Sequence, residues 1–336
     1  MAYTTINKST DYFNTKLWSG NGSSQALTGV GHQTDMVWIK SRTDTRKHNL
    51  YDVVRGVQKR IVPNDTVAED TVPGVTAFGT DGFTVGSETD TNGGSRNFVG
   101  WSWKANGAGS SNTDGSITST VSANTTAGFS IVKYTGYGGV STVGHGLGVA
   151  PNLIINKNFE SGSTNWFVGL IDWTKRLKLQ GTNTWDANTV WNDTAPTNQV
   201  FSLNGTNANS SGQDYIAYCF AEKTGYSKFG SYSGNSNADG TFIYLGFKPS
   251  FIMVKRTDTS NSYDNWIMYD NKRSGYNVDN DRLHADISDA ENTDNTIDIV
   301  SNGFKIRSAN SNLNGGSHIY MAFGQSLVGS NNIPAT

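Results

Sequence analysis

The chain carries the same series of short motifs three times in the same order. In each copy, an aromatic residue followed by Ser or Thr and then Gly precedes an apolar run by about twenty residues. That run ends in a lysine, which is Lys40, Lys157 or Lys255. A second apolar run, a polar stretch of variable sequence, a short run around a Phe and a final aromatic run follow. Recurrence at a fixed spacing indicates a repeated structural unit, here of roughly a hundred residues.

The final run of each copy alternates between large apolar residues and residues that are mostly small. In FVGWSW the large residues are Val99, Trp101 and Trp103, and YIAYCF and HIYMAF follow the same pattern. A period of two with one bulky face predicts a β-strand that packs on a core. The small residues on the other face indicate close approach by a second sheet or a neighbouring unit. The lysine that closes each earlier run is expected to mark the strand end, where the chain emerges into water.

The composition favours strands over helices along the whole chain. Gly occurs 38 times, and the abundant Asn, Ser and Thr compete with helical hydrogen bonds. Aromatic and β-branched clusters between Gly, Asn and Asp turns are typical of many short strands. We therefore expect an all-β fold of three tandem homologous antiparallel β-sandwich-like units, of a lectin-like or jelly-roll-like kind. A closed arrangement of the three units around a pseudo-threefold axis is the alternative.

The repeat also sets the expected boundaries. We expect an N-terminal arm at 1–10, β units at 11–105, 128–222 and 223–325, a connector at 106–127 and a C-terminal tail at 326–336. The Gly-, Ser-, Thr- and Asn-rich connector fits a flexible linker or a strand-bearing segment. The short joint AEKTGYSKF between the second and third units predicts that these two pack rigidly together.

Charge and cysteine content argue against several partners and compartments. The formal net charge of -2 offers no basic stripe for a nucleic acid, and no apolar run is long enough to span a membrane. The N-terminal MAYTTINKSTDYF lacks the basic start and apolar centre of a secretory signal. The single cysteine, Cys219, lies in an apolar run and is expected in the core. We expect a protein made in the cytosol without a disulfide framework.

The residues offer no specific constellation for catalysis or for a cofactor. The five histidines are scattered without the spacing of a metal site, and the acidic stretch 277–298 does not match an EF-hand loop. We expect that stretch to be a solvated variable loop, with bound Ca²⁺ as the alternative. Paired carboxylates for glycoside cleavage are assembled in space, so a glycan depolymerase is kept as an alternative. No catalytic residue is assigned, and we expect a protein that is not an enzyme.

Exposed aromatic side chains are the strongest candidates for ligand binding. Sugar rings stack on Trp and Tyr, while Asn and Asp side chains form hydrogen bonds with their hydroxyls. The polar variable stretch of the second copy contains Trp173, Trp185 and Trp191, and the same region of the third copy contains Tyr263 and Tyr276. The alternative for each of these residues is that it fills a gap between a loop and a sheet.

Several passages carry a resemblance to known proteins. They are SNTDGSITSTVSANTTAGFSIVKYTG (111–136), TVGHGLGVAPNLIINK (142–157), YIAYCFAEKTGYSKFGSYSGN (215–235) and SNGFKIR (301–307). Together with the N-terminal AYTTINKSTDYFNTKLWSGNG, they resemble a family of marine bacteriophage proteins of the cyanophage and pelagiphage type, which are tail-fibre or virion structural proteins. The resemblance extends over nearly the whole chain. It implies a component of the virion exterior, on the tail or the capsid, that is assembled in the host cytoplasm.

Two roles on a virion and one enzymatic role follow as hypotheses. The first is a tail-fibre or tail-tip module that binds the host cell surface, through a glycan or another receptor, without catalysis. The second is a capsid decoration or head-fibre protein in which residues 1–10 form an anchoring arm. The third is the glycan depolymerase. The expected partners are other virion proteins, the host glycan or receptor and further copies in a homo-oligomer, since display of several weak sites strengthens binding. Nucleic acid and membrane insertion are not expected.

Overall fold

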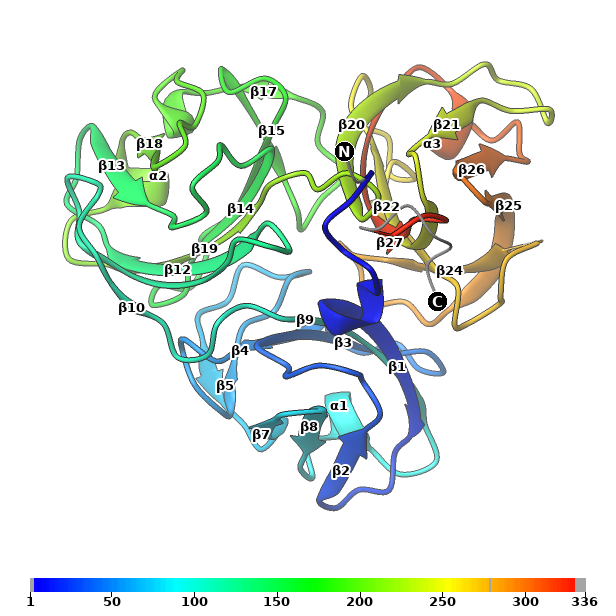
Figure 1. Cartoon of the computed structure of the whole chain (residues 1–336), viewed down its shortest axis with the longest axis horizontal. Coiled ribbons are helices and arrows are strands. Elements are labelled where there is room, and N and C mark those ends of the chain that lie inside the picture. Colours follow the sequence, from blue (N-terminus) through cyan, green and yellow to red (C-terminus); the bar gives the residue numbers. More distant parts are fainter. Residues whose placement is uncertain (1–2, 278, 330–336) are drawn as a thin grey trace.

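The structure is a computed structural model of the chain, and it describes residues 3–277 and 279–329. Antiparallel sheets make up the fold, and the helices of the described residues are single turns of three or four residues. The expectation of an all-β fold is confirmed. None of these helices is long and apolar enough to cross a membrane. The strands form three lobes grouped around a common centre (Figure 1).

Lobe 1 is formed by the first third of the chain. Its elements are η1 (Ser9–Asp11), β1 (Phe13–Ser19), β2 (Gln25–Thr28), β3 (Met36–Ser41), β4 (Asn49–Asp52), β5 (Lys59–Arg60), β6 (Asp70–Thr71), β7 (Val75–Gly79), β8 (Gly82–Val85), α1 (Thr89–Asn92) and β9 (Asn97–Trp103). The main sheet has the strand order β1-β9-β3-β4, and a smaller sheet has the order β2-β8-β7.

Lobe 2 begins inside the segment expected to be a connector. Its elements are β10 (Ser110–Asn112), β11 (Ser119–Asn124), β12 (Phe129–Thr135), β13 (Ser141–Gly144), β14 (Leu153–Asn158), β15 (Trp166–Leu170), β16 (Lys175–Lys178), β17 (Asp186–Ala187), η2 (Thr189–Trp191), β18 (Val200–Leu203), α2 (Thr206–Asn209) and β19 (Asp214–Phe220). The main sheet runs β10-β11-β12-β19-β14-β15-β16-β17, and β13 pairs with β18. The segment 106–127 thus supplies two strands, β10 and β11, to this sheet.

Lobe 3 completes the chain. Its elements are β20 (Ser227–Ser233), β21 (Phe242–Tyr244), β22 (Lys248–Arg256), β23 (Ile267–Asp270), β24 (Asp279–His284), β25 (Asn292–Val300), β26 (Gly303–Ile306), α3 (Ser311–Asn314) and β27 (Ser317–Gln325). Its strands follow the order β20-β27-β22-β23-β24-β25-β26-β21, which curls from the main sheet into the opposing layer.

The central strands of the three lobes pair in the same register. Lys40 pairs with Val99, Lys157 with Ile216 and Lys255 with Ile319. Four residues back along each lysine strand, Met36, Leu153 and Phe251 pair with Trp103, Phe220 and Phe323. The motifs that recur in the sequence therefore occupy matching places in the three sheets, and positions can be compared between lobes by this pairing.

Each main sheet is buried on both faces. In β19, the side chains of Ile216, Tyr218 and Phe220 enter a core shared by all three lobes, whereas Ala217 and Cys219 pack inside lobe 2 against the β13–β18 layer. The strands β9 and β27 divide in the same way between the shared core and the cores of their own lobes. The small residues of the alternating runs therefore face the second sheet, and the bulky ones face the neighbouring lobes.

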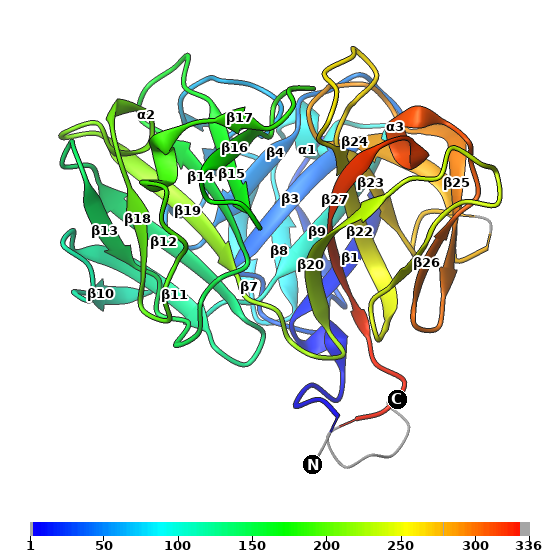
Figure 2. The same cartoon turned by 90° about the horizontal axis from the view of Figure 1, so that it is seen from above.

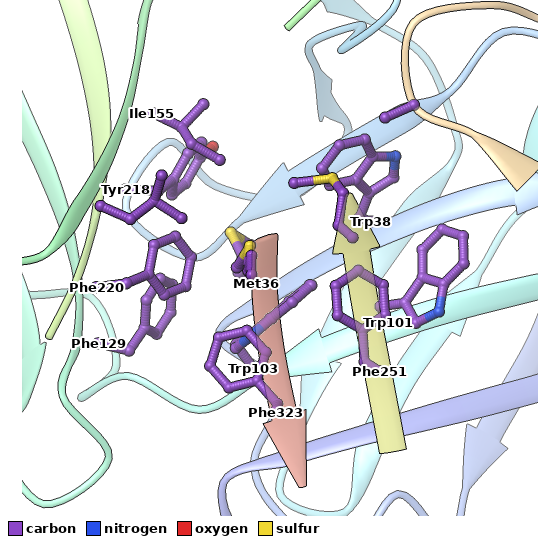
Figure 3. Packing of buried hydrophobic residues seen from close by; sticks show 14 of the residues in the cluster. Met36, Trp38, Trp101, Trp103, Phe129, Ile155, Tyr218, Phe220, Phe251 and Phe323 are labelled. Atoms are coloured by element: carbon purple, nitrogen blue, oxygen red, sulfur yellow. The ribbon is translucent and has the colours of Figure 1, made fainter. Parts of the chain in front are cut away.

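Aromatic rings from three matching positions meet at the centre of the molecule. The ring centroids of Trp103, Phe220 and Phe323 lie 6.4 Å, 5.8 Å and 5.9 Å apart, so they form a nearly regular triangle (Figure 3). Tilted and edge-on aromatic pairs of this kind add about 0.5–1.5 kcal/mol each beyond the area that they bury. One core shared by the three lobes corresponds to the closed arrangement rather than to three separate sandwiches.

The three strand-end lysines do not emerge into water. Lys40, Lys157 and Lys255 are each 0% exposed, so this expectation is wrong. Their ammonium groups donate to backbone carbonyls: Lys157 Nζ to Thr164 O at 2.9 Å, for example, and Lys40 Nζ to Ser41 O at 2.7 Å. The adjacent lobe covers the strand end that the sequence pattern places in solvent. A lysine buried there is tolerated because carbonyl oxygens accept hydrogen bonds from its ammonium group.

The N-terminal segment and the single-turn α-helices lie at opposite ends of the molecule. Residues 3–8 lie at one end, and the single-turn helices α1, α2 and α3 lie at the other (Figure 2). The N-terminal segment packs against the body, since Thr4 and Ile6 are buried and the Tyr3 hydroxyl donates to Gly246 O at 2.8 Å. Ser9 N donates to Gln325 Oε1, which ties the start of the chain to the last strand.

Candidate functional site

Three seams separate the lobes, and all are closed by the same backbone contact. Glu69 N donates to Phe159 O, Trp185 N to Thr257 O and Glu291 N to Arg42 O, at 2.7 Å, 3.3 Å and 2.9 Å. The acceptor in each pair lies two residues after the buried lysine of its lobe. We name the contact regions seam 1–2, seam 2–3 and seam 3–1 after the lobes that they join. In two of them the lysine also reaches across, from Lys157 Nζ to Thr66 O and from Lys255 Nζ to Thr182 O.

Seam 1–2 is held by a buried ionic cluster. Asp52 is fully buried and accepts hydrogen bonds from Arg55 Nε and from the Tyr218 hydroxyl of lobe 2, both at 2.7 Å. Arg55 Nη1 also donates to Glu69 at 3.0 Å. Because every charge has a partner, the cluster avoids the large cost of an isolated buried ion.

Seam 3–1 repeats this cluster with other residues. Asp270 is fully buried and accepts from Arg273 Nε at 2.6 Å and from the indole Nε1 of Trp101, across the seam, at 3.0 Å. Arg273 Nη1 donates to Glu291 at 2.9 Å, and Arg42 of lobe 1 binds the same carboxylate at 2.7 Å.

Seam 2–3 has apolar residues at the four positions that hold the aspartate, the arginine, the glutamate and the Tyr or Trp donor in the other two seams. The strand pairing places Leu170 where the other seams have Asp52 and Asp270. Three residues later, Trp173 replaces the arginine. Trp185 makes the backbone contact made elsewhere by Glu69 and Glu291, and Met321 lies at the position of Tyr218 and Trp101. The ionic cluster is therefore absent from this seam among the described residues.

A groove of about 610 Å³ lies at seam 2–3. Lobe 2 contributes Ile171, Asp172 and Trp185, and lobe 3 contributes the hydroxyls of Ser231, Ser233, Thr257 and Ser317 together with Asp258, Tyr232, His318 and Ile319. We call it the hydroxyl groove. Its volume lies within the range of small-molecule sites, and its lining combines one indole with several polar groups that can form hydrogen bonds.

Both carboxylates of the hydroxyl groove are held in the ionised form. A hydrogen bond from Thr174 and the ammonium of Lys175 lower the pKa of Asp172. A hydrogen bond from Arg256 lowers the pKa of Asp258. Ionised carboxylates are acceptors only, which suits them to hydroxyl donors of a ligand.

A second groove of about 240 Å³ adjoins the same tryptophan. Trp185 lines it together with Arg176, Lys178, Asn183, Thr184 and Asp186 of lobe 2 and Ser260 of lobe 3. We call it the basic groove. Arg176 lies over the Phe167 ring, with its Cζ carbon 4.6 Å from the centroid, and donates to Asp186 at 3.0 Å.

The five aromatic residues that the sequence singles out do not form one site. Trp185 is partly buried and borders both grooves. Trp173 is partly buried and packs edge-on against Trp191 at 5.5 Å, inside lobe 2. Trp191 is 0% exposed, so the expectation that its ring is exposed is wrong: it fills the space between loop and sheet. Tyr263 is 75% exposed, in the loop after β22. Tyr276 lies under the Lys248 ammonium, 3.3 Å from the ring centroid, in a pocket shared with residues 8–10.

The expectation that the acidic stretch 277–298 is a solvated loop is wrong, because it contains β24 and most of β25. Its described carboxylates are engaged in ion pairs. Glu291 pairs with Arg42 and Arg273, Asp294 with Arg282, and Asp298 with Arg307. Residue 278 and the side chains of residues 279, 280 and 295 lie outside the described part. Within the described residues, no group of three or more His, Cys, Asp or Glu side chains is placed to hold a metal ion.

Sequence reasoning missed the ionic clusters, although a signal for them exists. The segments YDVVR (51–55) and YDNKR (269–273) share a Tyr-Asp-x-x-Arg pattern, whereas lobe 2 has GLIDW (169–173) at the same place. Aspartate and arginine three residues apart at a strand end can form a local ion pair. The loss of that pattern in one copy of three marks the seam that carries the grooves.

Comparison with known proteins gives a family but no activity. No curated protein matches the chain. A family model described as a domain of unknown function (DUF7483) matches residues 8–326. Since that match spans nearly all of the 336 residues, the chain belongs to the DUF7483 family.

Proposed function

We propose that the protein is a non-catalytic module of a phage virion, at the tail fibre or tail tip, that binds a glycan of the host surface in the hydroxyl groove. The observation that carries the binding proposal is the difference between the seams. Two seams are closed by buried ionic clusters, and the third has two tryptophans in place of the arginine and the glutamate. The groove lies at that third seam.

The lining of the hydroxyl groove suits a sugar. The apolar face of a pyranose ring stacks on an indole such as that of Trp185, while its hydroxyls donate to Asp172 and Asp258. Ser231 and Ser233 add hydroxyls that both donate and accept, whereas the Thr257 hydroxyl donates to Ser317 O at 3.1 Å and can only accept from a ligand. The phage assignment rests on the sequence resemblance alone.

The position of the groove supports a role in display. Its lobe 3 residues Asp258 and Ser317 lie next to α3, at the end of the molecule opposite residues 3–8 (Figure 2). A module attached through the end that carries residues 3–8 would present this groove outward. Several copies on one particle would turn weak individual sites into firm attachment.

Binding to an array of bacterial surface oligosaccharides tests the groove. We expect the full chain to retain glycans and Trp185→Ala to weaken that binding at least tenfold, since the loss of a central tryptophan usually costs more than about 1.4 kcal/mol. Tyr137→Ala is the matched control, because Tyr137 is 77% exposed and lies outside both grooves. Equal glycan binding by Trp185→Ala and the unchanged chain would contradict the proposal.

The place of the protein on the particle is tested separately. Gold-labelled antibodies against the chain are expected to decorate the tail of the virion in electron micrographs. Labelling of the capsid shell would instead support the capsid decoration or head-fibre hypothesis. Release of reducing ends from a bound polysaccharide would revive the depolymerase hypothesis.

A further inference from the structure

The indole of Trp185 is a wall common to two grooves of different chemistry. Trp185 lines both the hydroxyl groove and the basic groove, so the two grooves adjoin at this residue. The volume of the basic groove, about 240 Å³, falls below the usual range for a complete ligand site, whereas the hydroxyl groove lies within that range. The smaller groove therefore fits an extension of the larger site better than a site of its own.

Trp185 is held in place by contacts between its backbone and lobe 3. Its backbone N–H donates to Thr257 O of lobe 3, and Lys255 Nζ of lobe 3 donates to Thr182 O in the same loop. Trp266 Nε1 of lobe 3 also donates to Lys178 O at 3.0 Å, which fixes the strand that carries the basic side chains. The two grooves are thus kept in a constant relation to each other, as recognition of a linear ligand requires.

The two grooves differ in the charge that is left for a ligand. In the hydroxyl groove, the carboxylates of Asp172 and Asp258 are each paired with a cation of their own lobe, Lys175 and Arg256. In the basic groove, Asp186 pairs with Arg176, and Lys178 forms no ion pair with any described residue. One positive charge is therefore uncompensated.

The guanidinium of Arg176 strengthens this asymmetry. Its Nε and Nη2 both donate to Asp186 Oδ2, whereas Nη1 is buried without a hydrogen-bond partner. A donor of this kind is costly to leave unpaired, and an anionic acceptor that draws the side chain toward the groove would remove the cost.

We propose that the glycan is a linear acidic oligosaccharide of at least two residues that crosses Trp185. A neutral residue occupies the hydroxyl groove, and a carboxylate-bearing residue lies in the basic groove beside Lys178 and Arg176. This proposal rests on the proposed function, because it assigns the ligand class of the same site. Recognition then depends on both chain length and charge.

The test uses the full chain and an array of bacterial surface oligosaccharides graded from one to six residues, in neutral and uronic acid-containing forms. We expect retention to begin at two residues and to favour the acidic members. Lys178→Gln should lower the affinity for acidic members about tenfold, in the range of one lost charged hydrogen bond, and leave neutral members unchanged. Lys272→Gln, an exposed lysine outside both grooves, is the charge-matched control.

The outcomes separate this proposal from the proposed function. Equal binding of neutral and acidic members, equal binding of single sugars, or an unchanged affinity of Lys178→Gln would overturn the acidic two-groove ligand. In each of these cases, loss of binding by Trp185→Ala would still leave seam 2–3 standing as a glycan site. Failure of the unchanged chain to retain any glycan would overturn both.

Discussion

Single side chains decide whether a seam between lobes is ionic or apolar. Asp52 and Arg55 are buried together, with side-chain exposures of 0% and 1%. Removing both charges of such a pair is often nearly neutral, whereas removing one leaves an uncompensated charge in the interior. At the matching places of lobe 2, Leu170 lies in the shared core and Trp173 packs into the core of its own lobe, so this fold also accepts a seam without the ion pair.

The first prediction concerns this pair. We expect Asp52→Leu to lower the free energy of unfolding by about 3–5 kcal/mol, since Arg55 then stays buried with only Glu69 as an ionic partner. Asp52→Leu combined with Arg55→Met should recover most of that loss. Urea denaturation, with the midpoints compared at an unchanged slope, measures both values. A double variant that is less stable than Asp52→Leu alone would contradict the argument.

Short elements hold the loops of each lobe through one buried asparagine. The single turns α1, α2 and α3 end in Asn92, Asn209 and Asn314, each 0% exposed. In lobe 2, Asn209 Nδ2 donates to Gly139 O and to Ser141 Oγ, and its Oδ1 accepts from Tyr137 N. The loop is therefore closed by one side chain that serves several polar groups at once.

A substitution at this asparagine has a defined cost. Asn209→Ala should lower the free energy of unfolding by about 2–3 kcal/mol, because buried groups of the loop lose their partner. Asn207→Ala in the same turn is the matched control: its side chain is exposed, and it should change stability by less than about 0.5 kcal/mol. Chemical denaturation of the two variants side by side distinguishes them, and similar losses would count against the role given to Asn209.

The elements also show how far sequence patterns reach. Alternation in FVGWSW, YIAYCF and HIYMAF predicts strands with a bulky buried face, and these runs are β-strands whose large residues enter the shared core. The burial of the strand-end lysines is not visible in the local sequence, because the lobe that covers them comes from a distant part of the chain. Trp185 borders a groove, but Trp191 fills a core, and both stand in similar polar surroundings in the sequence. The local sequence pattern therefore predicts the strands, whereas long-range packing determines which residues contact the strand ends and the loops.

At the scale of the whole molecule, the three buried lysines make the free energy of unfolding depend on pH. Burial lowers the pKa of Lys157 to about 7 and those of Lys40 and Lys255 to about 8. An unfolded lysine has a pKa of about 10.4, so between pH 7 and about 10 the unfolded chain binds more protons than the folded one. The free energy of unfolding therefore rises with pH across that window.

Other buried groups change the free energy of unfolding at pH values below and above this window. Burial lowers the pKa of His32, His284 and His318 to about 4, so stability also rises from pH 4 to about 6.5. Burial raises the pKa of Asp286 to about 7, which opposes that rise between pH 4 and 7. Buried tyrosines such as Tyr134, whose pKa is raised by burial, lower stability once the pH passes about 10.

The molecule should consequently be most stable near pH 9 to 10, above the range usual for proteins. We expect the free energy of unfolding to increase by several kcal/mol between pH 7 and 9.5, and Lys157→Met to remove about 3 kcal/mol of that increase, since one pKa unit corresponds to 1.36 kcal/mol. Lys8→Met is the control, because the Lys8 side chain is 54% exposed, and it should leave the slope unchanged. Urea denaturation at half-unit pH steps measures the profile. A flat profile, or an equal slope for Lys157→Met and the unchanged chain, would show that burial does not lower the pKa of these lysines.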